Sequence, residues 1–223
     1  MFTIDNGIED ALNGTKIGIL IMKNVSASGS LEESEVSDSL DEMHRRYGHL
    51  DRKELKALYP IQAYTVYYKR FGCSYPVLAQ LESVLNGKKA LHAESGLLQA
   101  MFLSELESML LTAGHDLSTL QLPLQLKAAS GNETYQSISG KEVTAVENDL
   151  MVCDGIGAIS SIMRGPDFKS RITASTADIL FTIYAPPGIE ADYIEDNLKR
   201  LEGRIKSFAA FSKTELLQVY SKD

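Results

Sequence analysis

The sequence predicts an α+β protein, because helical and strand-like segments occupy largely different parts of the chain. Apolar residues at helical spacing dominate up to Pro123, and the alternation typical of strands dominates after it. An unbroken apolar run at 16–23 adds one strand near the N-terminus. The sequence contains no internal repeat and no low-complexity tract.

Composition indicates a globular protein with a buried core. The chain has 223 residues, of which 44% are hydrophobic and 23% are charged. Its 22 basic and 30 acidic residues give a net charge of −8, which argues against broad, sequence-independent binding of nucleic acid. Any contact with RNA is therefore expected to use a local patch.

No segment predicts a membrane span or a secretory signal. The longest apolar run, Ile17–Met22, is far shorter than the ~20 residues that a spanning helix requires. Met1–Asn6 lacks the basic start and long apolar stretch of a signal peptide, so we expect a cytoplasmic protein rather than a membrane protein. Cys73 and Cys153 are expected to be buried small hydrophobic residues, not a disulfide or a metal site.

The N-terminal part combines an apolar strand with polar helices. Lys16–Lys23 is predicted to be a strand buried on both faces. Residues rich in Ser, Glu and Asp at 24–38 predict the most mobile loop of the chain, and a surface helix is expected over 31–47. A short helix at Leu50–Tyr59 is expected to stop at Pro60.

Aromatic and basic residues are concentrated at Ile61–Gly72. Aromatic rings beside lysine and arginine can stack on bases and bind phosphates, which is one interpretation of this patch. The other interpretation, which the usual role of Tyr and Phe favours, is a helix whose rings pack on the sheet.

Two amphipathic helices follow, at Pro76–Asn86 and Leu97–Ala113. Each ends before a glycine, Gly87 or Gly114, and glycine tolerates the left-handed backbone of a helix C-cap. The spacing of the apolar residues predicts that each helix buries one stripe against a sheet.

Beyond Pro123 the sequence predicts five strands and a last helix. Leu124–Ala128 and Thr134–Ile138 flank the turn residues at 130–132 and are expected to form a hairpin. The last helix, Ile189–Phe208, has a regular apolar seam that is expected to pack on the protein's own sheet, or otherwise on a second helix. The remaining strands are expected at Leu150–Cys153, Ala158–Met163 and Ile179–Ala185.

The strongest sequence signatures of chemistry are absent: there is no phosphate-binding loop, dinucleotide fingerprint, zinc spacing or nucleophile elbow. His44 and His49 are expected on a solvated face. His115 follows a predicted helix end, where the helix dipole favours a cation, and Asp116 is adjacent. The alternative is a surface His115 beside an Asp116 that caps the next turn.

Small polar residues near strand ends form a further set of candidates. Ser160 and Ser161 lie in a predicted strand, and Ser175 and Thr176 lie just before another. Such hydroxyls line ligand pockets, or they serve as turn and edge residues. Arg164, which precedes Gly165, is either an anion contact or an exposed side chain.

Several sequence strings follow one another in a recognisable order: the strand at 17–22, Leu81–Lys88, Leu111–Leu117, Asp149–Asp154 and Ser175–Thr176. Their order resembles the B3/B4 domain of the phenylalanyl-tRNA synthetase beta subunit over nearly the whole chain. The resemblance implies one B3/B4-like domain over 1–223, with mixed, largely antiparallel sheets and flanking helices. Within it, 1–60 would hold the N-terminal strand and surface helices, 61–188 the core and 189–223 the C-terminal helix.

In the synthetase this domain is an editing module that hydrolyses tyrosine mischarged on the phenylalanine tRNA, and stand-alone relatives are usually labelled tRNA-binding. This chain departs from the family pattern at the pocket. Met101–Phe102 stands in place of a Thr-Asn pair, Ser160–Ser161 in place of Gly-Gly, and Ser175 in place of a Glu, whereas Thr176 matches. Because ester hydrolysis needs a positioned water and groups that hold the oxyanion, the lost acid favours binding over hydrolysis.

The leading hypothesis is a module that binds an amino acid, an aminoacyl group or a tRNA 3′ end between the central helices and the sheet, without metal or cofactor. One alternative is a trans-editing aminoacyl-tRNA deacylase, and the other is a non-catalytic protein-interaction module built on the acidic segment around Glu32, Glu33 and Glu35. Catalytic residues and the oligomeric state do not follow from the sequence. The candidate ligand-binding residues are Glu105, His115, Asp116, Ser160, Ser161, Arg164, Ser175 and Thr176.

Overall fold

The computed structural model describes residues 2–5, 7–8, 12–25, 29–87 and 95–222. The helices are α1 (Glu33–Tyr47), α2 (Arg52–Ala57), α3 (Tyr59–Lys69), α4 (Pro76–Leu85), α5 (Gly96–Ser108) and α6 (Ala191–Phe208). The strands are β1 (Phe2–Ile4), β2 (Lys16–Lys23), β3 (Thr112–Asp116), β4 (Leu124–Ala128), β5 (Thr134–Gln136), β6 (Glu142–Thr144), β7 (Leu150–Cys153), β8 (Ala158–Ser161), β9 (Gly165–Pro166), β10 (Ile179–Ala185) and β11 (Lys213–Ser221).

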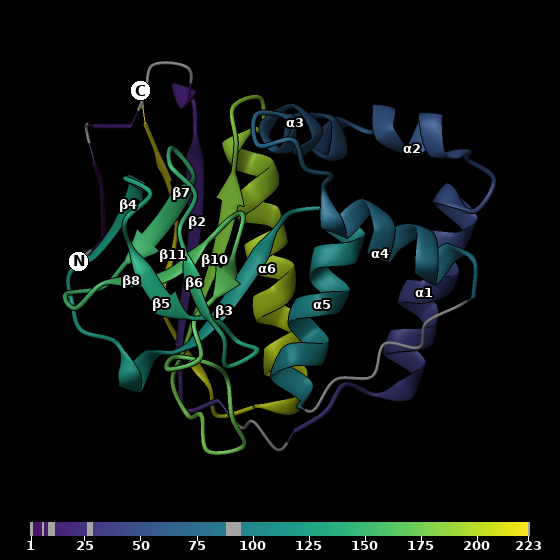
Figure 1. The fold of residues 1–223 in the computed structure, drawn as a ribbon. Helices are drawn as coiled ribbons and strands as arrows, with labels where there is room; N and C mark the ends of the chain where they lie inside the picture. The colour runs from purple at the N-terminus through teal and green to yellow at the C-terminus, as the bar shows by residue number, and fades with distance from the viewer. Residues whose placement is uncertain (1, 6, 9–11, 26–28, 88–94, 223) are drawn as a thin grey trace.

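The strands form two main sheets and a small third one. A four-stranded antiparallel sheet has the order β11-β2-β10-β3, and a five-stranded sheet has the order β1-β4-β7-β8-β9, in which only β1 and β4 pair in parallel. Figure 1 shows the helices on one side of the four-stranded sheet and most of the five-stranded sheet on the other. The predicted α+β class, with mixed, largely antiparallel sheets and flanking helices, is confirmed.

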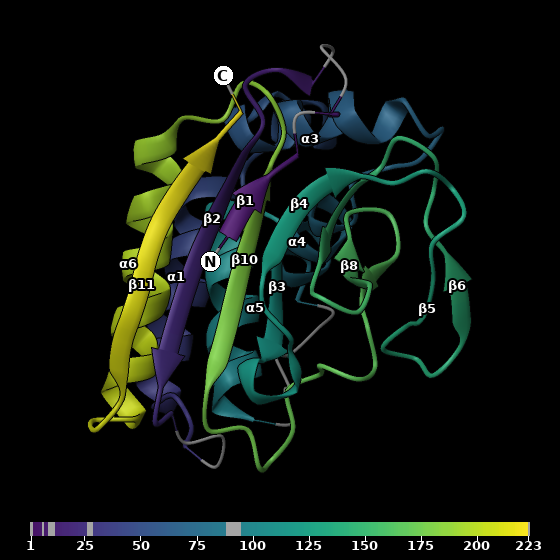
Figure 2. The same ribbon diagram turned by 90° about the vertical axis from the view of Figure 1, so that its left-hand side faces the viewer.

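The central strands of the four-stranded sheet are mostly apolar and buried. β2 lies between β11 and β10, as Figure 2 shows, and β10 pairs in turn with β3. All seven residues of β10 are buried, and so are Ile17, Ile19, Leu20 and Met22 of β2. The predicted strands Lys16–Lys23, Leu124–Ala128, Leu150–Cys153 and Ile179–Ala185 are confirmed with their bounds unchanged.

The predicted helix Leu97–Ala113 is too long at its C-terminal end. Helix α5 ends at Ser108, Met109 adopts a left-handed backbone with φ of 56°, and Thr112–Asp116 forms strand β3. The hydroxyl of Ser108 donates to Ser104 O and accepts from Leu110 N, so it satisfies groups that the helix end leaves open. His115 therefore lies in a buried strand, and the expected place at a helix C-cap is wrong.

The predicted hairpin around Ser130–Asn132 is also wrong. Strand β4 pairs with β1 and β7, whereas β5 pairs with β6 as a separate two-stranded sheet. Beyond β4 the chain still follows β7, because Ala129 N donates to Asp149 O and Asn148 N donates to Ala129 O. The chain does turn at residues 130–132, but the strand that follows pairs with β6 and not with β4.

The remaining corrections concern short segments. Pro60 lies in the first turn of α3, where its missing N–H costs nothing, so it helps to begin a helix as well as limiting α2. Residues 213–221, expected within the C-terminal helix region, form β11 on the open edge of β2. Cys153 is buried as expected, but Cys73 is exposed. Part of the predicted mobile loop, residues 26–28, lies outside the described residues, as does His92.

The aromatic residues of α3 are packing residues. Tyr64, Tyr67 and Tyr68 are at most 4% exposed, so the base-stacking interpretation of this patch is wrong and the packing interpretation is confirmed. Tyr67 donates to Asp149 Oδ1 at 2.7 Å and accepts from Leu150 N, which fixes the helix to the end of β7. His44 and His49 are exposed, as expected.

Helices α4 and α6 differ in what they cover. The apolar seam of α6, with Ile194, Leu198, Leu201 and Ile205 buried, packs on β2, β11 and α5, which confirms the expectation that it covers the protein's own sheet. Helix α4 packs on α1 and α5 instead of on a sheet, so it lies one layer further out (Figure 1).

Close contact between α6 and β2 depends on a glycine. A Cβ at Gly18 would lie 2.6 Å from Ile194 Cγ2 and 3.1 Å from Leu198 Cδ1. We expect Gly18→Ala to lower the free energy of unfolding by about 1–3 kcal/mol, because the added carbon overpacks this contact. Chemical denaturation measures the change.

The matched control for that substitution is Gly203→Ala on α6. Gly203 is exposed, and a Cβ there would have no neighbour within 4 Å. Alanine should therefore stabilise the helix by about 0.5–1 kcal/mol through its higher helix propensity. Equal effects of the two substitutions would contradict the packing account.

Candidate functional site

A cavity of about 640 Å³ opens between α5, β3 and the loop at 166–174. Apolar side chains dominate its lining, and its polar side chains are Thr112, Arg171 and Thr173. Volumes of roughly 300–1,000 Å³ with few polar groups are typical of sites for small molecules. The lining residues are Leu98, Met101, Phe102, Thr112, Ala113, Gly114, Ile138, Pro166, Phe168, Arg171, Ile172, Thr173 and Ala174.

The first two walls come from one chain reversal. The left-handed backbone of Met109 turns the chain from α5 into β3, and Thr112 N then donates to Glu105 Oε2 at 2.8 Å, which ties the strand back to the helix. Gly114 has no room for a side chain, because a Cβ there would lie 2.8 Å from Ile172 Cδ1 and 3.1 Å from Met101 Sδ. The backbone of Gly114 therefore forms the cavity floor, and the side chains of Ile172 and Met101 pack closely against it.

The third wall, the loop at 166–174, is held to β3 by buried polar groups. His115 Nδ1 lies 2.7 Å from Ser170 Oγ, and Ser170 donates its hydroxyl proton to Asp167 Oδ1. On the other side, Thr176 donates to Asp116 Oδ2 at 2.8 Å and accepts from Thr173 N. These contacts lie behind the cavity lining and fix the loop in place.

The His115, Ser170 and Asp167 side chains do not form a nucleophile. A hydroxyl has one proton, and Ser170 gives it to Asp167, so His115 must carry its proton on Nδ1 and donate to Ser170. In a catalytic triad the serine donates to the histidine instead. His115 is fully buried, and burial lowers its pKa to about 4, so it is neutral near pH 7. The 4.0 Å separation of His115 Nδ1 and Asp167 Oδ1 is therefore not an ion pair.

Glu105 is a second buried titratable group at this site. Burial raises the pKa of its carboxyl to about 7, while the hydrogen bond from Thr112 N acts in the opposite direction. Within the described ranges, no lysine, arginine or histidine forms an ion pair with it. Its role in the structure is to join α5 to β3.

None of the eight candidate residues from the sequence is among the residues that line the cavity. Four of them, Glu105, His115, Asp116 and Thr176, are buried behind its walls. Ser160 and Ser161 are buried in β8, where Ser160 Oγ bonds to Tyr184 OH, and exposed Arg164 donates to Thr144 O. Ser175 is exposed beside Thr173. Ligand binding by these residues stays a prediction.

Sequence reasoning missed the residues that face the cavity. It selected residues by chemical type, whereas the lining is mostly apolar and comes from four separate stretches of chain. One available signal was the cation and aromatic ring three residues apart at Phe168 and Arg171. The Arg171 guanidinium carbon lies 3.6 Å from the centroid of the Phe168 ring.

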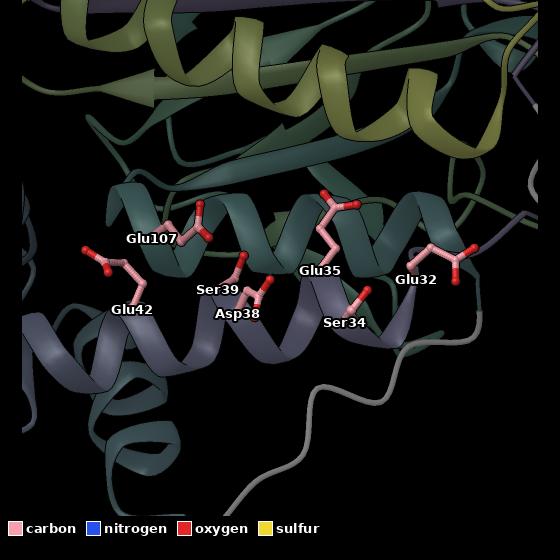
Figure 3. Close-up of a pocket in the computed structure, with 7 residues that line it drawn as sticks. All are labelled: Glu32, Ser34, Glu35, Asp38, Ser39, Glu42 and Glu107. Atoms are coloured by element: carbon pink, nitrogen blue, oxygen red, sulfur yellow. The ribbon is translucent and has the colours of Figure 1, made fainter.

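A second hollow lies between α1 and α5, and Figure 3 shows its acidic side chains along the two helices. Glu35 and Glu107 each form an ion pair with Arg204 of α6, at 3.5 and 2.6 Å. Part of the acidic segment around Glu32, Glu33 and Glu35 is thus neutralised within the chain. No set of three acidic, His or Cys side chains in the described ranges is arranged to hold a metal ion.

Comparison with solved structures finds chains of similar fold. The crystal structure of an N-terminal fragment of the phenylalanyl-tRNA synthetase beta-subunit from Pyrococcus horikoshii matches with a TM-score of 0.49 and 10% identity. The match covers 97% of this chain and 54% of that fragment, so the chain spans about half of the fragment's length. The likeness is one of fold. Nothing about activity follows from it.

No family model matches the sequence, and no curated protein matches it. None of the helices in the described part of the chain combines the length and the apolar character that crossing a bilayer requires.

Glu105→Gln should change how stability depends on pH. The folded pKa of about 7 exceeds the ordinary value of 4.5, so between these pH values the folded protein binds more protons at Glu105 than the unfolded chain does. Relative to Glu105→Gln, the original protein should lose on the order of 3 kcal/mol of unfolding free energy as the pH rises from 4.5 to 7. Denaturant titrations of both proteins across this range measure it.

Subtracting the two curves removes the contribution of His115, which has the opposite sign. Its folded pKa of about 4 lies below the ordinary 6.5, so stability from this residue is lost as the pH falls through that interval. A difference between the two proteins that does not vary with pH would contradict a buried, neutral Glu105.

Ser170→Ala should weaken the attachment of the loop to β3. The substitution leaves buried His115 Nδ1–H without its partner and removes one of the two bonds that Asp167 Oδ1 accepts from Ser170, so we expect a loss of about 1–3 kcal/mol. Ser175→Ala, an exposed site in the same loop, should change stability by less than about 0.5 kcal/mol. Thermal and chemical unfolding measure both changes. Equal losses of stability in the two variants would contradict this role of Ser170.

Proposed function

We propose that this protein is a binding module that takes the apolar side chain of an amino acid or of an aminoacyl group in the cavity between α5, β3 and the loop at 166–174. The observation that carries the proposal is the cavity itself, whose volume of about 640 Å³ and mainly apolar lining fit one such side chain with room for its polar end. Support also comes from the sequence strings that resemble a B3/B4 domain, because aminoacyl groups are the ligands of that family.

The walls favour a preformed site. The loop is fastened by Ser170 and Thr176 to the same strand that forms the floor, and α5 is fastened to that strand through Glu105. Buried and satisfied hydrogen bonds of this kind hold a site near its binding geometry and reduce the entropy lost on binding. A tRNA, if it is the carrier of the aminoacyl group, needs to bring only its 3′ end to the opening.

Hydrolysis has less support than binding. Among the described residues, the lining contains no His, Cys, Asp or Glu side chain, and the His115 ring behind it is fully buried. General base catalysis requires such a group within hydrogen-bonding reach of the attacking water. We therefore propose binding without deacylation, and a deacylation assay with mischarged tRNAs should show no turnover above the buffer rate.

The ligand class is tested by calorimetric titration with apolar amino acids and with aminoacyl-adenosine analogues. We expect binding that Ala174→Trp abolishes, because Ala174 is exposed at the cavity and an indole there fills the opening. Ala177→Trp is the matched control, since Ala177 is also exposed but does not line the cavity. Binding that is equal in both variants would place the ligand elsewhere, and no binding by any of these compounds would refute the ligand class.

A further inference from the structure

Among the described residues that line the cavity, Arg171 is the one cationic side chain, and Phe168 holds it in position. Its guanidinium lies over the Phe168 ring, and its Nη1 donates to Phe168 O at 2.7 Å. The ring and the carbonyl belong to the same residue, so the loop itself carries the support for the guanidinium. A stacked guanidinium of this kind loses little further freedom when it binds an anion.

Within the described ranges, no carboxylate balances the charge of Arg171. Among the described residues no carboxylate forms an ion pair with it, whereas its neighbour Lys169 pairs with Asp154 at 3.5 Å. A guanidinium has five N–H donors, and one bond to the Phe168 carbonyl leaves most of them unused. Arg171 is only partly buried and lines the cavity, so its remaining donors are available to a ligand there.

The rest of the lining determines what such a ligand looks like. Phe102, Phe168 and Ile172 offer apolar surface beside the guanidinium, and the described part of the lining has no carboxylate that would compete for it. A planar guanidinium fork matches the two oxygens of a carboxylate, and a partly water-excluded site strengthens that contact. Ligand and cavity are then complementary in both shape and charge.

We infer that Arg171 is the anion anchor of this cavity and that it selects a ligand with a free carboxylate and an apolar or aryl body over an amide or an ester of similar shape. The inference rests on the proposed use of the cavity as a ligand site. It narrows the proposed ligand classes to free acids such as an amino acid, because an aminoacyl ester has no free carboxylate.

A set of three compounds of similar shape tests the inference on the unaltered protein. These are 3-phenylpropionate, its uncharged amide and phenylalanine methyl ester, each titrated by calorimetry. The acid should bind roughly ten- to a hundredfold more tightly than the amide, which is the range expected for hydrogen bonds to a charged group. The ester, which carries an ammonium and no carboxylate, should bind no better than the amide.

Variants then assign the preference to Arg171. Arg171→Met should bring the acid to the affinity of the amide, and Arg171→Lys should restore part of the difference, since lysine keeps the charge without the fork. Lys169→Met is the matched control, because it removes the same charge from the same loop while its side chain faces Asp154. The control should keep the full preference for the acid.

The outcomes separate this inference from the proposed function. Equal binding of acid and amide by the unaltered protein would overturn the anchor and leave the cavity as the ligand site. A preference for the acid that survives Arg171→Met, or that is lost equally in Lys169→Met, would also overturn it. Binding of the acid with no binding of amino acids or aminoacyl analogues would support the anchor and refute the aminoacyl ligand class. Absence of binding by all three compounds would overturn the inference.

Discussion

The chain reversal at Met109 is the constraint on which the cavity depends. Residues 109–111 carry the chain from the end of α5 to the start of β3, and the Glu105 carboxyl accepts from Thr112 N across this reversal. Helix and strand are thereby placed at contact distance, and the pairing of β3 with β10 fixes the strand in the four-stranded sheet. Two of the three cavity walls follow from this one local arrangement.

The third wall depends on polar groups that are themselves out of solvent. Ser170 and Asp116 are buried, and both join the loop at 166–174 to β3. Because buried polar groups are costly when unpaired, each of these bonds favours one position of the loop over its alternatives. The Asp, Ser and His side chains in this region thus stabilise the structure. Among the described residues, the surface left to a ligand is apolar apart from Arg171 and two threonines.

Sequence reasoning succeeded where a local pattern decides the structure. The apolar run of β2 and the apolar seam of α6 each predict which of their residues are buried. It failed where long-range pairing decides: apolar residues continue at helical spacing past Ser108, and only the ladder with β10 makes Thr112–Asp116 a strand. The same limit hid the cavity, because its walls meet only in the folded chain. Six of the eight residues chosen for reactive side chains proved to be buried, whereas Arg164 and Ser175 are exposed. The overall fold class could be predicted without such detail.

The central claim is that a small apolar ligand occupies the space between α5, β3 and the loop at 166–174. Mapping of backbone amide shifts by nuclear magnetic resonance during titration with 3-phenylpropionate tests it directly. The account predicts that the largest shifts fall on Ala113, Gly114, Ile172 and Ala174, which line the cavity. Shifts centred on the acidic hollow around Glu35 and Glu42, or no shifts at saturating ligand, would contradict it.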